Sequence, residues 1–388
     1  MISRIKIVNI FCLYVLSVPL FNSSKYSFIC NILFLFFFLM VLAKKIIKFD
    51  IYAFFLCVYI GWIGVSSVLT EFSTASIKMC YSTCSLVIMV ILMQTILEKK
   101  DVRKIENSFI AGSMILVLID AVLFILSCSP NAVLGSATVN PNNAGVNLAF
   151  SSVFIANRVF TGKQVKSFIL WIILEFLVFC TQSRSSILLS VIGIFSILFM
   201  NLIKMPIQIN KNIIVIFIIL MLLISIAYCS GFLKESLNRF LVIREEIRNA
   251  GTSAGSVAVR MNLKQIGWQA FLEKPWFGHG IGMTSNYFRH IYFHDNYIQL
   301  LFEIGIVGII TYYMPFIICL ISSVKNKVVM AEVILACIFI EGVFDVTYHN
   351  KIYYILFGIC ILLNKKESIG KNSEYINYWA GNPDRTES

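Results

Sequence analysis

The longest polar interruption in an otherwise apolar chain runs from Ser256 to Gly308 and reads SVAVRMNLKQIGWQAFLEKPWFGHGIGMTSNYFRHIYFHDNYIQLLFEIGIVG. Apolar residues at three- and four-residue spacing predict that it begins as an amphipathic helix. These residues are Val259, Leu263, Ile266, Ala270 and Phe271. Pro275 ends that helix, and the glycines of FGHGIG predict a flexible turn. The chain re-enters an apolar run after HDN, so the basic and histidine side chains of this stretch are expected where a loop meets a membrane.

Composition sets the class of the whole chain. Its 388 residues are 59% hydrophobic and only 13% charged, and a bilayer is crossed by about 20 apolar residues in a helix. Such runs recur along the chain and predict an all-α integral membrane protein with about 12 transmembrane helices. The predicted spans are 5–21, 26–43, 50–69, 77–97, 108–129, 143–157, 167–182, 185–202, 212–230, 296–322, 329–348 and 352–364.

Lysine and arginine residues predict the orientation of these spans. They concentrate in one set of connections, such as the KKDVRK segment at 99–104, and in the C-terminal tail. The positive-inside rule then places both termini in the cytoplasm and the long connection outside. The predicted organisation is nine spans over 1–230, an external amphipathic-helical loop over 231–295, three spans over 296–364 and a cytoplasmic tail over 365–388. The net charge of +12 is therefore a topology signal and does not indicate nucleic-acid binding.

The sequence lacks the motifs of nucleotide and metal chemistry. The 11 cysteines lie almost wholly in the hydrophobic runs, and no cluster has the spacing of metal ligands. The glycines of FGHGIG follow no predicted strand and are followed by no lysine, so they are not a phosphate-binding loop. We therefore expect no cofactor and no metal, and any chemistry must proceed without nucleotide hydrolysis.

Three side chains stand out at the external boundary of the predicted spans. Arg184, in TQSRSS, has almost no loop around it, and an arginine at that depth needs a polar cavity, an anion or a lipid phosphate. Arg260 lies beside the apolar face of the predicted helix and can point back at the bundle. His294 directly precedes a span, where it is either a proton carrier near neutral pH or a hydrogen-bonded interfacial histidine.

Other polar residues lie at the same boundary or inside spans. Asn142, in VNPNNAG, either helps to cap the following helix or hydrogen-bonds a sugar. Glu303, Glu341 and Asp345 fall inside predicted spans, and the last two share a helix face from which they could orient a histidine or an arginine.

These residues also carry a family resemblance. SRS at 183–185, then Arg260 followed by W-x-x-F-x-x-x-P-W-F-G-H-G-I-G, then H-D-N-Y-I-Q-L-L-F-E-I-G-I-V-G resemble the O-antigen ligase and polymerase superfamily. The resemblance covers about 181–308, and the earlier spans match it only in number and hydropathy. Most family ligases have a glycine where Ser185 stands, and many members lack the residue equivalent to Asp295.

The resemblance implies a membrane glycosyltransferase in the bacterial inner membrane, with its active site on the periplasmic face. The donor would be a glycan on undecaprenyl diphosphate, and the acceptor lipid A–core or a second lipid-linked glycan. Arg184 and Arg260 would bind the diphosphate and His294 would act as the base. Asn142, Asn296, Glu303 and Asp345 would contact substrate. The motif is shared by ligases and polymerases; outside the enzyme class, a 12-span chain could be a lipid-linked oligosaccharide flippase or transporter.

Overall fold

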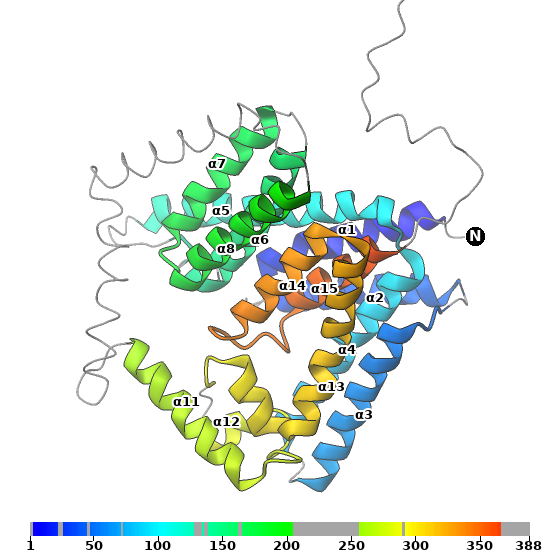
Figure 1. Ribbon diagram of the computed structural model, residues 1–388, viewed down its shortest axis with the longest axis vertical. Coiled ribbons are helices and arrows are strands. Elements are labelled where there is room, and N and C mark those ends of the chain that lie inside the picture. The colour runs from blue at the N-terminus through cyan, green and yellow to red at the C-terminus, as the bar shows by residue number, and fades with distance from the viewer. Residues whose placement is uncertain are drawn as a thin grey trace, which may run out of the picture.

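The computed structural model describes residues 3–21, 26–44, 47–70, 73–127, 134–135, 139–161, 165–204, 256–288 and 292–365. These residues form 13 α-helices and one 3₁₀-helix (Figure 1). The α-helices are α1 (Arg4–Phe21), α2 (Ser27–Leu42), α3 (Ile51–Leu69), α4 (Thr74–Ile96), α5 (Val102–Ser127), α6 (Pro141–Thr161), α7 (Val165–Cys180), α8 (Arg184–Lys204), α11 (Ser256–Glu273), α12 (Thr284–Tyr287), α13 (Asn296–Asn326), α14 (Val329–Glu341) and α15 (Lys351–Asn364). The 3₁₀-helix η1 is Lys99–Asp101.

The all-helical prediction is confirmed for the described residues, and each predicted span among them overlaps a helix. Six helical segments are long and apolar enough to cross a membrane: α1, α3, α4, η1 with α5, α8 and α13. The helices α2 and α15 are apolar but shorter. The chain is therefore a multi-pass membrane protein, while a total of about 12 crossings remains a prediction. The predicted span 212–230, the first part of the predicted external loop (231–255) and nearly all of the tail lie outside the described residues.

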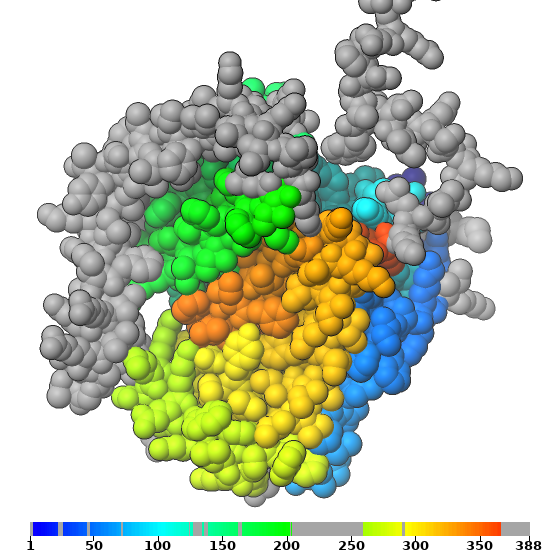
Figure 2. All heavy atoms as spheres, viewed as in Figure 1, coloured from blue at the N-terminus to red at the C-terminus, as the bar shows by residue number. Residues whose placement is uncertain are grey.

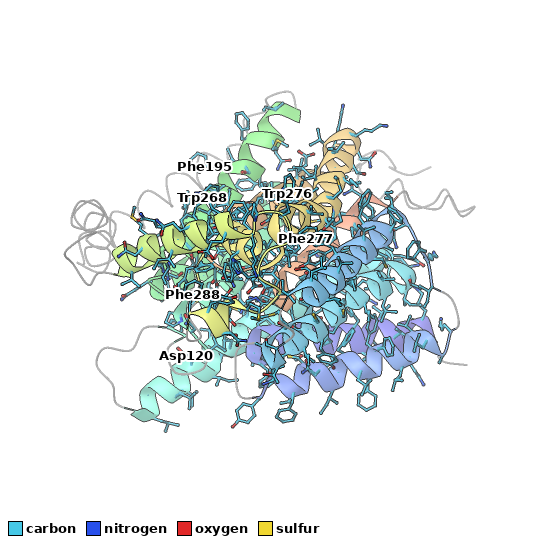
Figure 3. All side chains as sticks on the ribbon, turned by 90° about the horizontal axis from the view of Figure 1, so that it is seen from below. Asp120, Phe195, Trp268, Trp276, Phe277 and Phe288 are labelled. Carbon is cyan, nitrogen blue, oxygen red and sulfur yellow. The ribbon has the colours of Figure 1, made fainter. Side chains whose placement is uncertain are left out.

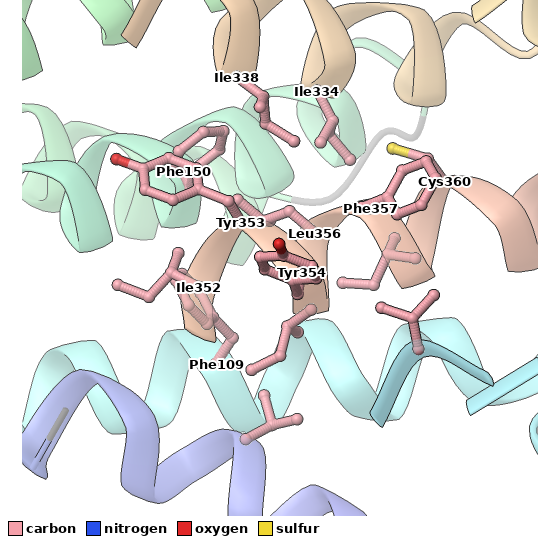
Figure 4. Close-up of a cluster of buried hydrophobic side chains, with 14 of the residues drawn as sticks. Phe109, Phe150, Ile334, Ile338, Ile352, Tyr353, Tyr354, Leu356, Phe357 and Cys360 are labelled. Carbon is pink, nitrogen blue, oxygen red and sulfur yellow. The ribbon is translucent and has the colours of Figure 1, made fainter. Parts of the chain in front are cut away.

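The core of the bundle is built around α15. Every residue from Ile352 to Leu362 is buried, and Figure 4 shows these side chains among those of α5, α6 and α14. The rings of Phe316 and Phe357 stack with their centroids 4.1 Å apart, and Gly358 lets Met93 of α4 approach the α15 backbone. Lipid tails are as apolar as these side chains, so burial alone does not drive helices together in a membrane. Close packing of small residues and aromatic rings holds them together instead.

Buried carboxylates inside the bundle are held by neighbouring helices. Glu175 on α7 accepts hydrogen bonds from Ser152 and, at 2.6 Å, from Ser190. On the neighbouring helices, Arg158 of α6 pairs with Glu106 of α5 at 2.7 Å. These contacts satisfy polar groups that would be costly if they were left alone in the apolar interior.

The helix α13 is broken near its start. Gly305 has φ 70° and ψ −172°, so residues 296–304 and 306–326 are two helices that meet at an angle. The segment after α11 bridges the break, because the backbone N–H groups of His279, Gly280 and Ile306 donate at 2.8 Å to the carbonyls of Phe302, Glu303 and Pro275. Backbone groups freed by the break are thus paired, as an apolar environment requires.

The glycines of FGHGIG form a closely packed turn, whereas the sequence predicted a flexible one. Gly278, Gly280 and Gly282 all have positive φ, at 72°, 105° and 75°, a conformation that side chains other than glycine rarely adopt. A Cβ atom on Gly278 would lie closer than 3.0 Å to the backbone of Glu303. The turn is therefore packed directly against the break in α13.

The end of α14 also differs from the prediction. The span predicted to reach 348 ends as a helix at Glu341. Beyond this residue, backbone groups form hydrogen bonds with Asn296 instead of continuing the helix. The N–H of Asn296 donates to the carbonyl of Gly342 at 2.7 Å, and its side-chain oxygen accepts from Thr347 and Tyr348 at 2.8 and 2.9 Å. Asp345 consequently lies in a turn rather than on a shared helix face with Glu341.

Candidate active site

Four segments far apart in sequence converge at the end of the bundle that carries α11. They are the start of α8, the helix α11, the residues that precede α13, and the turn that follows α14. Figure 2 shows the segment around α14 (orange) lying between α8 (green) and the α11–α12 region (yellow-green). We use the name rim cluster for five side chains of these segments. They are Arg260, Lys264, His294, Glu341 and Asp345.

His294 is held in an unusual backbone conformation. Its φ is 53°, in the left-handed region that residues with a side chain seldom occupy. The neighbouring residues fix it there. Asp295 caps α13, accepting from the N–H groups of Tyr297 and Ile298 at 3.0 and 3.1 Å, and the N–H of Phe293 donates to Gln299 at 3.2 Å. Strain of this kind is concentrated at functional sites in proteins.

Two cations of α11 lie beside His294. Lys264 pairs with Asp295 at 2.8 Å and donates to the carbonyl of Val343 at 2.7 Å, which links α11 to both neighbouring segments. Burial and then the positive charge of Arg260 lower the pKa of His294, and Lys264 adds to this effect while Asp345 opposes it. The neutral imidazole, which can accept a proton, is therefore favoured.

The carboxylates of the rim cluster connect it to α8. Glu341 interacts with the side chain of Ser185 and with the charges of Asp345 and Arg260. Among the described side chains, its Oε2 is buried without a hydrogen-bond partner, which is costly for a carboxylate unless a positive charge or a ligand compensates. Asp345 is half-buried and accepts from the N–H of Val346 at 2.8 Å.

Arg184 is the first residue of α8 and is half-buried. The residue Gln182, two positions earlier, has φ 51°, so the chain turns sharply into this helix.

The start of α6 packs against the start of α8, because Ser186 donates to the carbonyl of Asn142 at 3.4 Å. Asn140 accepts from the N–H of Asn142 at 2.9 Å, so Asn140 is the capping residue, and Asn142 itself is half-buried.

The side chains of Asn296 and Glu303 form hydrogen bonds within the protein. Both are fully buried. Besides its contacts to the turn after α14, Asn296 donates to Tyr313 at 2.8 Å. Glu303 accepts from Thr284 at 2.7 Å, from Gln299 at 2.7 Å and from Tyr348 at 2.5 Å. These contacts hold the segments that carry His294 and Asp345, so a positioning role fits both residues, and direct substrate contact by them stays a prediction.

The structure adds residues that sequence reasoning did not single out. Lys264 lies one turn after Arg260, and this four-residue spacing was the signal that could have found it. His349 had no such signal: its ring stacks on Tyr292 at 5.7 Å, and it interacts with the charge of Asp345. Asp345 therefore lies between two histidines that are 55 positions apart in the chain.

His279 has a structural environment instead of a place in the rim cluster. Its ring stacks on Phe302 at 4.6 Å, and its Nε2 lies 2.8 Å from the carbonyl oxygen of Ala270. Two other basic residues of the stretch, Arg289 and His290, lie outside the described residues. Within the described part of the chain, no group of three or more His, Cys, Asp or Glu residues is placed to hold a metal ion.

The spanning helices and the charged cluster at their rim define a multi-pass membrane protein with a polar site at one end of its bundle. Residues 168–313 match the family model of the O-antigen ligase, which confirms the resemblance carried by the sequence motifs. The match includes Arg184, Arg260 and His294 and implies glycan transfer of the O-antigen ligase or polymerase type, with lipid-linked glycan substrates. No curated protein matches the chain.

Proposed function

We propose that this protein is an O-antigen ligase, which transfers a glycan from undecaprenyl diphosphate to lipid A–core on the periplasmic face of the inner membrane. The observation that carries the proposal is that Arg260 and Lys264 lie close enough to His294 for their charges to lower its pKa, inside the region that matches the family model. Cations can bind a diphosphate, and a neutral imidazole can take a proton from a sugar hydroxyl.

In this reaction the hydroxyl oxygen of the acceptor attacks the anomeric carbon of the donor glycan, and His294 accepts the hydroxyl proton. The bond between the anomeric carbon and the phosphate oxygen breaks, so undecaprenyl diphosphate leaves with the bonding electrons and the anomeric configuration inverts. Arg260 and Arg184 stabilise the negative charge that develops on the diphosphate. The free energy comes from the bond between sugar and phosphate, so no nucleotide is consumed.

The carboxylates have supporting roles in this scheme. Asp345, which interacts with His294, stabilises the imidazolium that forms when the proton is transferred. Glu341, between Ser185 and Arg260, orients the arginine toward the diphosphate. Asn142 would hydrogen-bond a sugar hydroxyl of the donor in this scheme; its backbone carbonyl contacts Ser186 near the start of α8.

Substitutions in the rim cluster test the chemistry. His294→Gln is expected to lower transfer by about 10²–10⁴-fold, the usual contribution of a general base, and Arg260→Gln by about 10²–10³-fold. Lys274→Gln is the matched control, because it removes a positive charge from an exposed position just after α11, away from the cluster. The proposal fails if the His294 variant transfers glycan at the parent rate, or if Lys274→Gln is as damaging as the Arg260 variant at equal membrane abundance.

The alternative within the family is a repeat-unit polymerase, whose acceptor is a second lipid-linked glycan. Deletion of the gene separates the two, because a ligase-null cell should carry bare lipid A–core and accumulate long lipid-linked chains. A polymerase-null cell should carry core with a single repeat. The apolar surfaces of the region around α11 favour docking of lipid A–core, which is the reason for proposing the ligase. Accumulation of unflipped lipid in the inner leaflet would instead indicate a flippase or transporter.

The proposed orientation has both termini in the cytoplasm. A phosphatase reporter that is active only in the periplasm should be active when fused after Asn249 and inactive when fused after Lys104. The reverse pattern would place the rim cluster on the cytoplasmic side and would exclude a periplasmic acceptor.

A further inference from the structure

The helix α11 presents three different stripes of side chains. One stripe faces the protein and carries Arg260, Lys264, Gly267 and Phe271, at the spacing of one helix face. Gly267 is buried against Ile298 and Phe293. This stripe accounts for the two cations of the rim cluster, and it leaves the rest of the helix surface unexplained.

The adjacent stripe is exposed and, apart from Gln265, apolar. It carries Met261, Gln265, Trp268 and Leu272, and the three apolar side chains have exposed fractions of 43%, 46% and 57%. The chain that follows extends it with Trp276, which is 61% exposed, the largest of these fractions. The third stripe carries Asn262, Gln269 and Glu273, which are polar and exposed, together with Ile266. The stripe of Asn262, Gln269 and Glu273 is thus mostly hydrophilic, whereas the stripe of Met261, Trp268 and Leu272 is hydrophobic.

The apolar stripe is continuous with the exposed surface of a membrane-spanning helix. Phe277 follows Trp276 and stacks on Trp62 of α3, with the ring centroids 5.4 Å apart. Ser66 of α3 donates to the carbonyl of Phe277 at 2.8 Å. Beyond this contact α3 exposes Val65, Val68 and Leu69, and Val68 is 80% exposed. Figure 3 looks at this end of the molecule, where Phe277 lies beside α3.

We infer that the stripe from Met261 to Trp276 lies in the lipid headgroup and upper acyl region of the bilayer that surrounds α3. The exposed outer end of α3 is covered by lipid in any membrane that the helix crosses. The apolar surface that continues it through Phe277 and Trp276 is covered by the same lipid. Tryptophan is the residue favoured at this depth, because its ring is apolar and its N–H can reach water or a headgroup.

This placement fixes the depth of the rim cluster. An interfacial helix buries its apolar face about 5–10 Å into the boundary between headgroups and acyl chains. The stripe of Arg260 and Lys264 is one residue, or 100° of helix rotation, from the apolar stripe, so both cations lie near the level of lipid phosphates. A diphosphate on a polyprenyl anchor lies at the same level. This last consequence rests on the proposed function, whereas the lipid contact itself does not.

Tryptophan fluorescence in lipid nanodiscs tests the contact without any measurement of activity. The chain has five tryptophans, and Trp62 is retained because it stacks on Phe277 and donates to the carbonyl of Ile304. The emission of Trp276 is therefore taken as the difference between the parent protein and Trp276→Phe. We expect this component to be quenched about twofold more strongly by lipids that carry a nitroxide near the headgroup than by lipids labelled near the bilayer centre.

Buried Trp171 provides the control, because Trp171→Phe should leave the lipid-quenched component unchanged. Trp268→Phe supplies a second, independent difference if Trp276→Phe does not yield folded protein. Quenching of both components by aqueous iodide, with no effect of lipid nitroxides, would overturn the inference in favour of an exposed aqueous surface. Loss of lipid quenching in discs that hold two copies would overturn it in favour of a contact between copies of the chain.

Discussion

Substitution of Gly305 by alanine tests the joint on which the candidate active site is built. The φ and ψ of Gly305, 70° and −172°, lie in a region that is essentially restricted to glycine. A Cβ atom there would lie closer than 3.0 Å to the carbonyl oxygen of Trp276, a backbone atom that cannot rotate away. The added methyl must therefore push the segment after α11 off the break in α13.

Two effects contribute to the cost of this substitution, the backbone conformation and the steric clash. The unfavourable backbone conformation costs about 1–3 kcal/mol, and overpacking by one methyl group costs about 1–3 kcal/mol. Gly305→Ala is therefore expected to destabilise the protein by about 2–6 kcal/mol, the sum of these two ranges. The hydrogen bonds from His279, Gly280 and Ile306 to carbonyls across the break would be strained together, so glycan transfer should fall with stability.

The measurement is unfolding in mixed micelles of a mild detergent and dodecyl sulfate, followed by tryptophan fluorescence. Gly64→Ala is the matched control, because Gly64 lies inside α3 with no atom within 4 Å of the added Cβ. That substitution should be neutral or stabilise the helix by up to about 1 kcal/mol. Equal stability of Gly305→Ala and the parent protein would refute the conclusion that this joint is rigid.

Three further predictions concern the chemistry of the site. Lys264→Met removes a positive charge that lowers the pKa of His294, so the acidic limb of the pH–rate profile should move to higher pH. Asp345→Asn removes the opposing negative charge and should move that limb to lower pH, and an unchanged limb in both variants would exclude His294 as the titrating base. Arg184→Lys should lower transfer by about 10²-fold if the flat guanidinium binds the diphosphate through two hydrogen bonds. Full activity of the lysine variant, or loss of parent activity in a chelator, would contradict this role for Arg184.

Much of the secondary structure was readable from local sequence. Runs of apolar residues marked the helices, because a bilayer demands length and hydropathy and little else. Pro275 marked the end of α11 correctly, since proline lacks the N–H that a helix interior needs. The motif around Arg184, Arg260 and His294 indicated a resemblance to the O-antigen ligase and polymerase superfamily, and residues 168–313 match the O-antigen ligase family model.

The spacing of apolar residues did not show which face of α11 the protein buries. The apolar residues whose spacing predicted the helix include Val259 and Ile266, which are 48% and 41% exposed. The buried side is centred on Gly267, because only a residue without a side chain lets Ile298 and Phe293 approach that closely. Hydrophobic periodicity finds apolar positions, but beside a membrane lipid can cover an apolar face as readily as protein can.

The sequence by itself determined the class of protein, the positions of most helices and the presence of arginines and a histidine in the stretch that contains the site. Only the tertiary structure decided that α13 breaks at Gly305, that Asp345 lies in a turn, and that Lys264 and His349 lie near His294 and Asp345. The reason is physical. Hydropathy and helix ends depend on neighbours within a few residues, whereas the break and the turn are held by hydrogen bonds between segments tens of residues apart.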